Sequence, residues 1–409
     1  MKKFFALLLS LAMVLALVAC GQKETTTPDD TQTPDDTTPE VEYKIAMITD
    51  YGDITDQSFN QTTYEACKAF AEDNSIEFSY FKPAGDNTAD RVAMIEKAVN
   101  DGFNVIVMPG YAFGGAIVEA APEFPDVKFI ALDVAAGDLL ETAVAKAGEA
   151  YDYTPENWDL NKYVDMSNVY CAVYQEELCG YMAGYAAVKL GYKNLGFLGG
   201  MSVPAVVRYG YGFVQGVDAA AADLGLTDVK LNYIYGGQFF GDADITAVMD
   251  TWYQGGTEVV FACGGGIYTS AVDAAKKANA KVIGVDVDQA GVIAKYAGVD
   301  GMTVTSAMKG LYPATYDTLT DVIVNGNWDK YVGKIETLGL VSGTDPEANY
   351  VQIPMGDGTQ WSDSFTQDDY KAMVKDMFDG KITVSNDTTK APTDFATAIT
   401  VNAQGQIKG

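Results

Sequence analysis

Short apolar runs alternate with longer amphipathic stretches along most of the chain after residue 42. The runs have the length of buried β-strands, and most stretches between them repeat apolar residues at helical spacing. Repeated βα units of this size indicate an α/β fold of parallel sheets covered by helices on both faces. Because one core rarely grows beyond about 250–300 residues, we expect two such sheets, each in its own lobe.

The predicted strands are Lys44–Thr49, Glu77–Phe81, Val105–Pro109, Lys128–Leu132, Val169–Val173, Leu195–Leu198, Lys230–Tyr235, Val259–Ala262, Val282–Val285 and Met302–Ser306. The clearest predicted helices are Ser58–Asp73, Ala89–Asp101, Glu176–Leu190, Val206–Leu224 and Tyr268–Ala278. In open α/β sheets, ligands bind beyond the carboxyl ends of the strands. The chemistry of this chain is therefore expected where these strands end.

Carboxylates directly follow or end three predicted strands, at Asp50, Asp133 and Asp286. Asp is also common in turns and caps, so a structural reading of each residue stays open. Gly264–Gly266 follows a fourth strand and opens a helix, but it matches neither the dinucleotide nor the P-loop pattern. We interpret this glycine run as a tight turn that lets the backbone approach a ligand.

The first helix carries two polar signals. Ser58 and Gln61 fit a capping box, with Ser58 at the N-cap. Asn60 and Tyr64 lie one turn apart, beside the stripe of apolar residues that begins at Phe59 and is expected to face the core. The amide and the ring suit either helix structure or ligand contact, and the residues alone leave both interpretations open.

Composition narrows the possible functions. The 409 residues hold 56 acidic and 27 basic side chains and no histidine, for a net charge of −29. Nucleic-acid binding requires a basic face, so it is excluded as a function. The lack of histidine removes Ser-His and Cys-His nucleophile pairs and His-containing zinc sites, which lowers the expectation of an enzyme. We expect no catalytic residue, cofactor or metal.

Five cysteines are present, and four of them follow the N-terminal region, at Cys67, Cys171, Cys179 and Cys263. No CxxC pair occurs, so their spacing predicts no zinc site. Each lies in an apolar stretch, where a cysteine is typically a small buried hydrophobe. A disulfide stays open as an alternative because no spacing selects a pair.

The N-terminus has the pattern of a signal peptide over residues 1–19, with two lysines before an apolar run that is short for a membrane span. The run ends in Leu-Val-Ala-Cys at residues 17–20, which resembles the bacterial lipobox and implies lipidation of Cys20. An uncleaved anchor with an incidental cysteine is the alternative. Residues 20–42 repeat Thr-Pro-Asp-Asp and predict a disordered acidic tether to the membrane.

Six stretches resemble the basic membrane protein family, which comprises lipoprotein solute-binding components of ABC transporters and includes purine-nucleoside receptors. They are residues 49–61 (TDYGDITDQSFNQ), 175–184, 196–208, 264–266, 283–289 and 305–309. The resemblance implies a type I periplasmic-binding-protein fold, with two Rossmann-like lobes and a multi-strand hinge. We place the first lobe at residues 43–192 and 303–327, and the second at residues 193–302 and 328–409.

The same resemblance implies the polar residues of a nucleoside site between the lobes. Asp50 and Asn60 are expected to hold the base edge or the ribose, with Asp133 beside them. Asp286 and Lys309 are expected to bind the ribose hydroxyls. Carboxylates suit this role because they accept both hydroxyls of a vicinal diol.

Aromatic residues are expected to sandwich the base, by the same resemblance. The candidates are Tyr64, Tyr209 and either Phe239 or Phe240, with the Gly264 backbone close to the ligand. Base stacking on an aromatic ring contributes about 1–3 kcal/mol. The acidic chain should also disfavour phosphorylated ligands, which favours a nucleoside over a nucleotide.

The sequence therefore predicts a monomeric, membrane-anchored extracytoplasmic protein that delivers a nucleoside, purine by preference, to an ABC permease. Riboflavin, a sugar or another ring-plus-polyol solute is the first alternative. A hydrolase using Asp53 and Asp56 is the second, although Asp56 better suits a helix cap. Residues 134–166 and the region after Gly343 are longer than the family pattern and are expected to reshape the mouth of the cleft.

Overall fold

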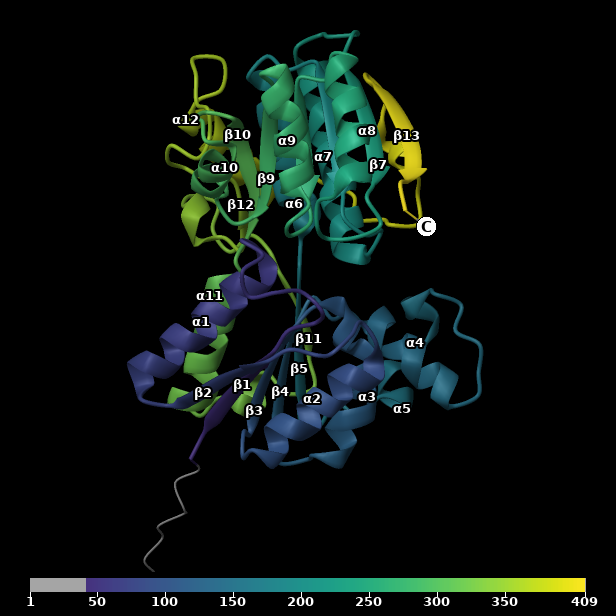
Figure 1. Ribbon diagram of the computed structural model, residues 1–409, viewed down its shortest axis with the longest axis vertical. Coiled ribbons are helices and arrows are strands. Elements are labelled where there is room, and N and C mark those ends of the chain that lie inside the picture. The colour runs from purple at the N-terminus through teal and green to yellow at the C-terminus, as the bar shows by residue number, and fades with distance from the viewer. Residues whose placement is uncertain (1–41, 409) are drawn as a thin grey trace, which may run out of the picture. The chain divides into compact units, whose positions relative to one another are not determined.

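The computed structural model describes residues 42–408, which form two β-sheets in two lobes (Figure 1). The predicted signal peptide, Cys20 and nearly all of the predicted tether lie outside the described residues. No helix in the described part of the chain is long and apolar enough to cross a bilayer. All ten predicted strands are present, most of them within one residue of the predicted ends.

The first sheet has six parallel strands in the order β11-β5-β4-β3-β1-β2. These are β1 (Lys44–Ile48), β2 (Glu77–Phe81), β3 (Val105–Pro109), β4 (Lys128–Leu132), β5 (Val169–Tyr174) and β11 (Ile335–Leu338). One face is covered by α1 (Phe59–Asn74) and α11 (Leu311–Leu319). The other face is covered by α2 (Thr88–Asn100), α3 (Gly114–Ala120) and α4 (Ala136–Lys146). The short helix α5 (Leu160–Tyr163) follows α4.

The second sheet has the order β12-β10-β9-β8-β6-β7-β13, and only β12 runs antiparallel to its neighbour. Its strands are β6 (Asn194–Gly199), β7 (Lys230–Tyr235), β8 (Val259–Cys263), β9 (Lys281–Asp286), β10 (Thr303–Lys309), β12 (Val351–Gln352) and β13 (Thr400–Gln406). One face packs on α6 (Glu176–Lys189), α7 (Pro204–Asp223) and α12 (Gln367–Phe378). The other packs on α8 (Ala243–Gln254), α9 (Tyr268–Ala278) and α10 (Ala290–Ala297).

The chain crosses between the sheets three times: after β5, after β10 and after β11. The first lobe thus holds residues 43–175 and 311–338, and the second lobe holds residues 176–310 and 339–408. The expected boundaries differ, because they placed α6 and β10 in the first lobe and β11 in the second. Strand pairing decides this: β10 pairs with β9 and β11 pairs with β5, which no apolar pattern reveals.

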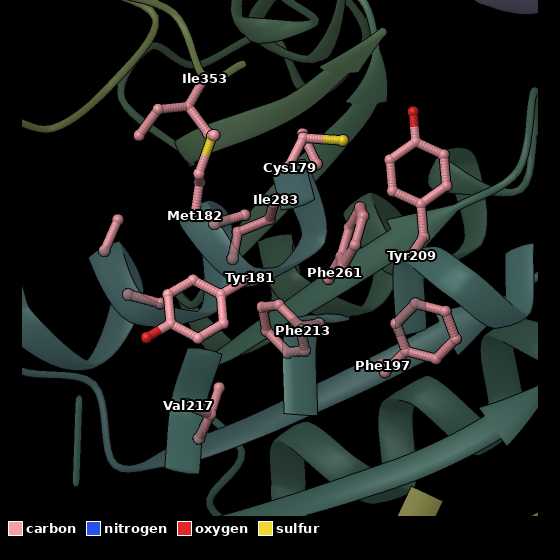
Figure 2. Close-up of a cluster of buried hydrophobic side chains, with 14 of the residues drawn as sticks. Cys179, Tyr181, Met182, Phe197, Tyr209, Phe213, Val217, Phe261, Ile283 and Ile353 are labelled. Atoms are coloured by element: carbon pink, nitrogen blue, oxygen red, sulfur yellow. The ribbon is translucent and has the colours of Figure 1, made fainter. Parts of the chain in front are cut away.

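The second lobe is organised around the crossing of α6 and α7. Gly180 and Gly184 on α6 face Gly212 and Gly216 on α7, and a Cβ on any of the four would overlap backbone of the facing helix. The close approach buries α6 on nearly every side, which explains its lack of a polar stripe. Figure 2 shows the resulting core, in which the Phe213 ring of α7 packs on the Phe261 ring of β8, with ring centres 5.2 Å apart, and Met182 of α6 belongs to the same cluster.

The region after Gly343 is integrated into the second lobe. Strand β12 extends one edge of the sheet beside β10, and β13 extends the other edge beside β7. Helix α12 packs into the same core through residues such as Tyr370. Cys67, Cys171, Cys179 and Cys263 are buried and free, so none of these four forms a disulfide.

Candidate functional site

A cavity of about 410 Å³ lies between the two lobes, at the carboxyl ends of strands from both sheets. Nine of the ten predicted site residues line it: Asp50, Asn60, Asp133, Tyr209, Phe239, Phe240, Gly264, Asp286 and Lys309. Tyr64 does not line it, because its ring packs against Phe78 and Tyr80 of β2. The expectation that Tyr64 faces a ligand therefore does not fit its position in the fold.

Asp133 and Asp286 end their strands in an unusual backbone conformation. Their φ angles are +60° and +65°, in the left-handed region that costs most side chains about 1–2 kcal/mol. Asp tolerates this region better than other residues, since its short side chain bonds locally. Strained backbone of this kind clusters at ligand sites, and here it turns two carboxylates of opposite lobes into one cavity.

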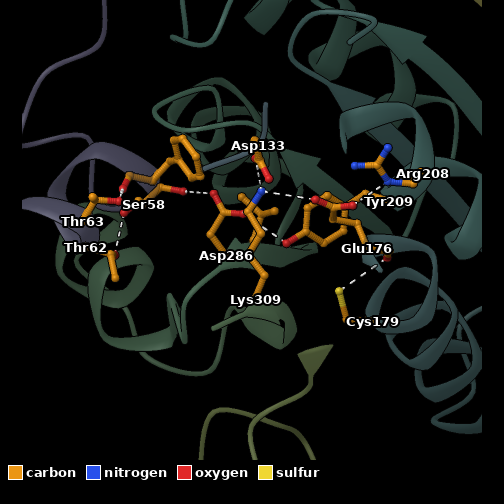
Figure 3. A network of polar contacts seen from close by, with 12 residues as sticks. Ser58, Thr62, Thr63, Asp133, Glu176, Cys179, Arg208, Tyr209, Asp286 and Lys309 are labelled. Carbon is orange, nitrogen blue, oxygen red and sulfur yellow. Dashed lines mark hydrogen bonds and ion pairs between the residues drawn. The ribbon is translucent and has the colours of Figure 1, made fainter. Parts of the chain in front are cut away.

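The Asp286 carboxylate joins the two lobes. The Ser58 hydroxyl at the start of α1 donates to its Oδ2 at 2.5 Å, and the Tyr209 hydroxyl of α7 donates to its Oδ1 at 3.1 Å (Figure 3). Lys309 Nζ lies 3.9 Å from the same Oδ1. Ser58 belongs to the first lobe and Asp286 to the second, so this buried bond spans the cleft.

The predicted capping box at Ser58 and Gln61 is wrong in its hydrogen bonds. Ser58 is the N-cap residue by position, but its hydroxyl donates to Asp286 and caps nothing. Asp56 takes the role instead: its carboxylate accepts the backbone N–H groups of Ser58 (2.9 Å), Asn60 (2.9 Å) and Gln61 (3.1 Å). Asp56 is thus a helix cap that lines the cavity, and Asp53 pairs with Lys82 at 2.9 Å.

Lys309 is the charged centre of the cavity. Its Nζ lies 2.5 Å from Asp133 Oδ2 and 3.4 Å from Glu176 Oε1, and 4.7 Å from the centre of the Phe59 ring. Burial by itself lowers the pKa of Lys309, but the carboxylates of Asp133, Asp286 and Glu176 outweigh it and hold the pKa above its ordinary value. The lysine is therefore charged and fully paired.

Two polar atoms on the first-lobe side of the cavity are buried without a partner among residues 42–408: Asn60 Oδ1 and Asp133 Oδ1. The Asp50 carboxylate beside them accepts the N–H groups of Tyr51 (2.6 Å) and Gly52 (2.7 Å) and lies 3.4 Å from the Asn60 amide nitrogen. Buried polar atoms are almost always hydrogen-bonded. Both unpartnered atoms are acceptors, and protein neighbours cover them in this state, so an O–H or N–H donor of a ligand reaches them only after the surrounding side chains shift.

Burial raises the pKa of Asp133 to about 6, and Lys309 opposes this effect. Burial likewise raises the pKa of Asp50, against the backbone N–H groups that it accepts. The cavity therefore presents carboxyl groups whose charged form is poorly solvated. Such groups gain from a ligand that donates hydrogen bonds to them.

Aromatic rings enter the cavity from both lobes. Phe59 and Tyr51 come from the first lobe and Phe239 from the second, and the Tyr51 and Phe239 ring centres lie 6.3 Å apart. Gly264, at φ +149°, passes so close to the Phe239 ring that a Cβ there would lie 2.8 Å from it. The glycine run is thus a tight turn, as predicted, and it makes room for an aromatic ring.

Several residues that line or support the cavity were missed by the sequence reasoning. Phe59 was assigned to the core because it begins the apolar stripe of α1, but at the helix start that stripe faces the cavity. Glu176 and Arg208 form a buried ion pair at 2.7 Å, and Glu176 also contacts Lys309. Their motifs were noted, but only the α6–α7 crossing brings the two side chains together.

The chain is similar in sequence to a known family of transport proteins. The family model of PnrA-like ABC transporter substrate-binding proteins (Bmp) matches residues 43–344. The ABC transporter nucleoside-binding protein BmpA of Lactococcus lactis subsp. cremoris is 25% identical over 359 residues, which cover 84% of this chain and 90% of that protein. Basic membrane protein B of Borreliella burgdorferi is 26% identical over 322 residues, covering 76% of this chain and 83% of that protein.

The solved structures show the same architecture. A crystal structure of an ABC transporter solute-binding protein from Aeropyrum pernix matches with a TM-score of 0.60 at 20% identity, covering 86% of this chain and 90% of the other. At that identity the likeness concerns the fold alone. It confirms the predicted type I periplasmic-binding-protein fold, with two α/β lobes around a cleft.

Proposed function

The chain belongs to the Bmp family of PnrA-like ABC transporter substrate-binding proteins, and from this premise we propose that its interlobe cavity captures a purine nucleoside. Membership makes the protein a binding component that passes a small molecule to an ABC permease on the extracytoplasmic side of the membrane, and not an enzyme. Family membership indicates the class of function, and the residues that line the cavity indicate the ligand.

The observation that carries the proposal is that aromatic rings and carboxylates line the same cavity. Phe59 and Phe239 approach from opposite lobes, and Asp50, Asp133 and Asp286 line the space between them. A nucleoside supplies both halves: a flat base that stacks and a sugar that donates hydroxyls. Stacking contributes about 1–3 kcal/mol per base. The relative from Lactococcus, named for nucleoside binding, supports the same reading.

Charge pairing supports a nucleoside over a nucleotide. Lys309 has three carboxylates within 4 Å, at Asp133, Glu176 and Asp286. Its positive charge is therefore already neutralised, which makes it a poor partner for a phosphate. We propose that Asp286 and Lys309 hold the ribose diol and that Asp50 and Asn60 hold the base edge. Asp53 and Asp56 add two further carboxylates to the lining, against the cations Lys82 and Arg208, which pair with Asp53 and Glu176.

Calorimetric titration of the purified protein with adenosine, inosine, uridine, adenosine monophosphate, riboflavin and ribose tests the proposal. We expect adenosine or inosine to bind at least a hundredfold more tightly than the monophosphate or ribose. Tighter binding of riboflavin or a free sugar than of any nucleoside would replace the proposal with the ring-plus-polyol alternative. Recovery of intact nucleoside after incubation is the check that no hydrolysis occurs.

We further propose that Cys20 carries lipid and anchors a monomer to the membrane through residues 20–42. The lipobox at residues 17–20 supports this. Lipid chains gain about 0.8 kcal/mol for each buried CH₂, so several chains hold a protein firmly. Cys20→Ser should leave an unlipidated protein that no longer partitions with membranes, as measured by detergent phase separation and mass spectrometry. A lipidated Cys20→Ser protein would overturn the assignment.

A further inference from the structure

The cavity reaches across both faces of the first sheet. Helix α1, which brings Phe59 and Asn60, covers one face together with α11. Helix α4, which brings Asp138, covers the opposite face with α2 and α3. Ala135, Asp138 and the Val203–Arg208 segment at the start of α7 all line the same cavity. We call this part the α4–α7 end, and the proposed contacts to base and ribose leave it unassigned.

The terminal nitrogens of Arg208 have no hydrogen-bond acceptor among the described residues at this end. Its Nε donates to Glu176 Oε2 at 2.7 Å, but its two terminal nitrogens donate to no residue within 42–408. In Figure 3 these nitrogens point away from Glu176. The side chain is 15% exposed and lines the cavity. A guanidinium has five N–H donors in a fixed fork, so most of its donors remain available here.

Asp138 has a free oxygen at the same end. Its Oδ2 accepts the backbone N–H of Ala135 at 2.8 Å, which closes the first turn of α4. Its other oxygen has no partner in the described part of the chain, and it is not sealed in the protein interior. Burial raises the pKa of Asp138 to about 7, and Arg208 acts in the opposite direction. Both side chains line the same cavity.

The charges at this end are already matched. Arg208 bonds to Glu176 and is also held by the charges of Asp133 and Glu177. A further anion here would be repelled by these carboxylates. An uncharged polar group would meet only the terminal N–H donors of Arg208 and the free oxygen of Asp138.

We propose that the α4–α7 end is a second polar subsite, in which the Arg208 guanidinium and the Asp138 carboxyl hold an uncharged hydroxyl or carbonyl group of the ligand. This inference rests on the proposed nucleoside function and deepens it. The ligand then spans the cleft from the α1 face to the α4 face of the first lobe. The subsite selects for a substituent at the far end of the molecule.

The test measures dissociation constants of inosine, purine riboside and 5′-deoxyinosine for the wild type, Arg208→Lys and Asp138→Ala. Purine riboside lacks the carbonyl at position 6, and 5′-deoxyinosine lacks the 5′-hydroxyl. We expect one of these deletions to weaken wild-type binding at least tenfold, because a hydrogen bond to a charged group is lost. In both variants the same deletion should cost less than threefold, because the group no longer has its partners.

A matched variant separates capping from ligand contact. Asp369 occupies the same position in α12, where its carboxylate accepts the Thr366 N–H at 2.8 Å, and it does not line the cavity. Asp369→Ala should lower the melting temperature about as much as Asp138→Ala but leave all three dissociation constants unchanged. Equal weakening of all three ligands by Arg208→Lys and Asp138→Ala would overturn the subsite and leave both residues as scaffold. A wild type that binds none of the three would instead refute the nucleoside function itself.

Discussion

At the scale of single residues, the site is built from side chains that hold the fold and face the ligand at once. Asp286 combines a left-handed backbone with hydrogen bonds from Ser58 and Tyr209. Its location was predictable, because an apolar strand that ends directly in Asp must present that carboxylate at the sheet edge. The bond to Ser58 was not predictable, since it joins residues 228 positions apart.

Asp286→Asn should weaken nucleoside binding at least tenfold and leave the protein folded. Asn tolerates a positive φ about as well as Asp, whereas Ala would add about 1–2 kcal/mol of strain. A hydrogen bond to a charged group contributes about 1.5–3 kcal/mol and one between neutral groups about 0.5–1.5 kcal/mol, so losing the charge of Asp286 weakens each hydrogen bond that it accepts. Calorimetry gives the affinity, and thermal melting gives the stability. An unchanged affinity with a lower melting temperature would leave Asp286 as scaffold alone.

Glu177 offers a prediction about pH. Burial, with help from Glu176, raises its pKa to about 7 from an ordinary value of 4.5, and its Oε2 has no partner among the described residues. Between these two pKa values the folded protein keeps a proton that the unfolded chain has lost. The free energy of unfolding therefore falls as pH rises from about 4.5 to about 7.

Glu177→Gln removes this titration, so it should raise the melting temperature relative to wild type more at pH 8 than at pH 5. Glu96→Gln removes one exposed carboxylate of α2 and controls for the change in net charge. If the advantage of Glu177→Gln is the same at both pH values, Glu177 does not titrate as burial predicts.

At the scale of elements, periodicity predicted the ten strands β1–β10 but missed β11, β12 and β13. The missed strands are short or polar: β12 has two residues, and β13 reads Thr-Val-Asn-Ala-Gln-Gly-Gln. Each lies at the edge of a sheet, where one side of the strand needs no apolar cover. The apolar pattern of α1 also does not show which face of the helix start points into the cavity. It therefore predicts Tyr64 as a ligand contact and places Phe59 in the core.

The α6–α7 crossing depends on glycine. Gly212→Ala would place a Cβ against the Glu177 carbonyl oxygen and should destabilise the second lobe by about 1–3 kcal/mol, as overpacking does. Gly291→Ala in α10 is the matched variant, because its Cβ would have open space. There the better helix propensity should stabilise the protein by about 0.5–1 kcal/mol. Denaturant unfolding measures both, and a neutral Gly212→Ala would show that the helices can separate freely.

At the scale of the whole molecule, several contacts join the lobes across the cleft. Ser58 bonds to Asp286, Gln289 Nε2 donates to the Gln57 carbonyl oxygen at 3.1 Å, Lys309 pairs with Asp133, and the Tyr51 ring lies near Phe239. The sequence could not supply these pairs, because each joins elements that meet only when both lobes are folded. They describe a state in which the lobes are in contact.

Ligand binding should favour that state over an open one, since a ligand that touches both lobes binds the closed form more tightly. Small-angle scattering of the wild type should show a smaller radius of gyration at saturating adenosine than without it. Asp286→Asn at the same adenosine concentration controls for nonspecific compaction and should change less. An identical radius with and without bound adenosine would argue against hinge closure.

The three crossings between the sheets also bear on when the chain can fold. The first sheet is complete only when β11 pairs with β5, and the second only when β13 pairs with β7. These partners are separated by more than 150 residues, so the first sheet cannot be completed before residue 338 has been made, nor the second before residue 406. Long-range pairing of this kind slows folding. The proposed export as an extended chain would gain from that delay, because neither sheet can be completed until most of the chain has been made.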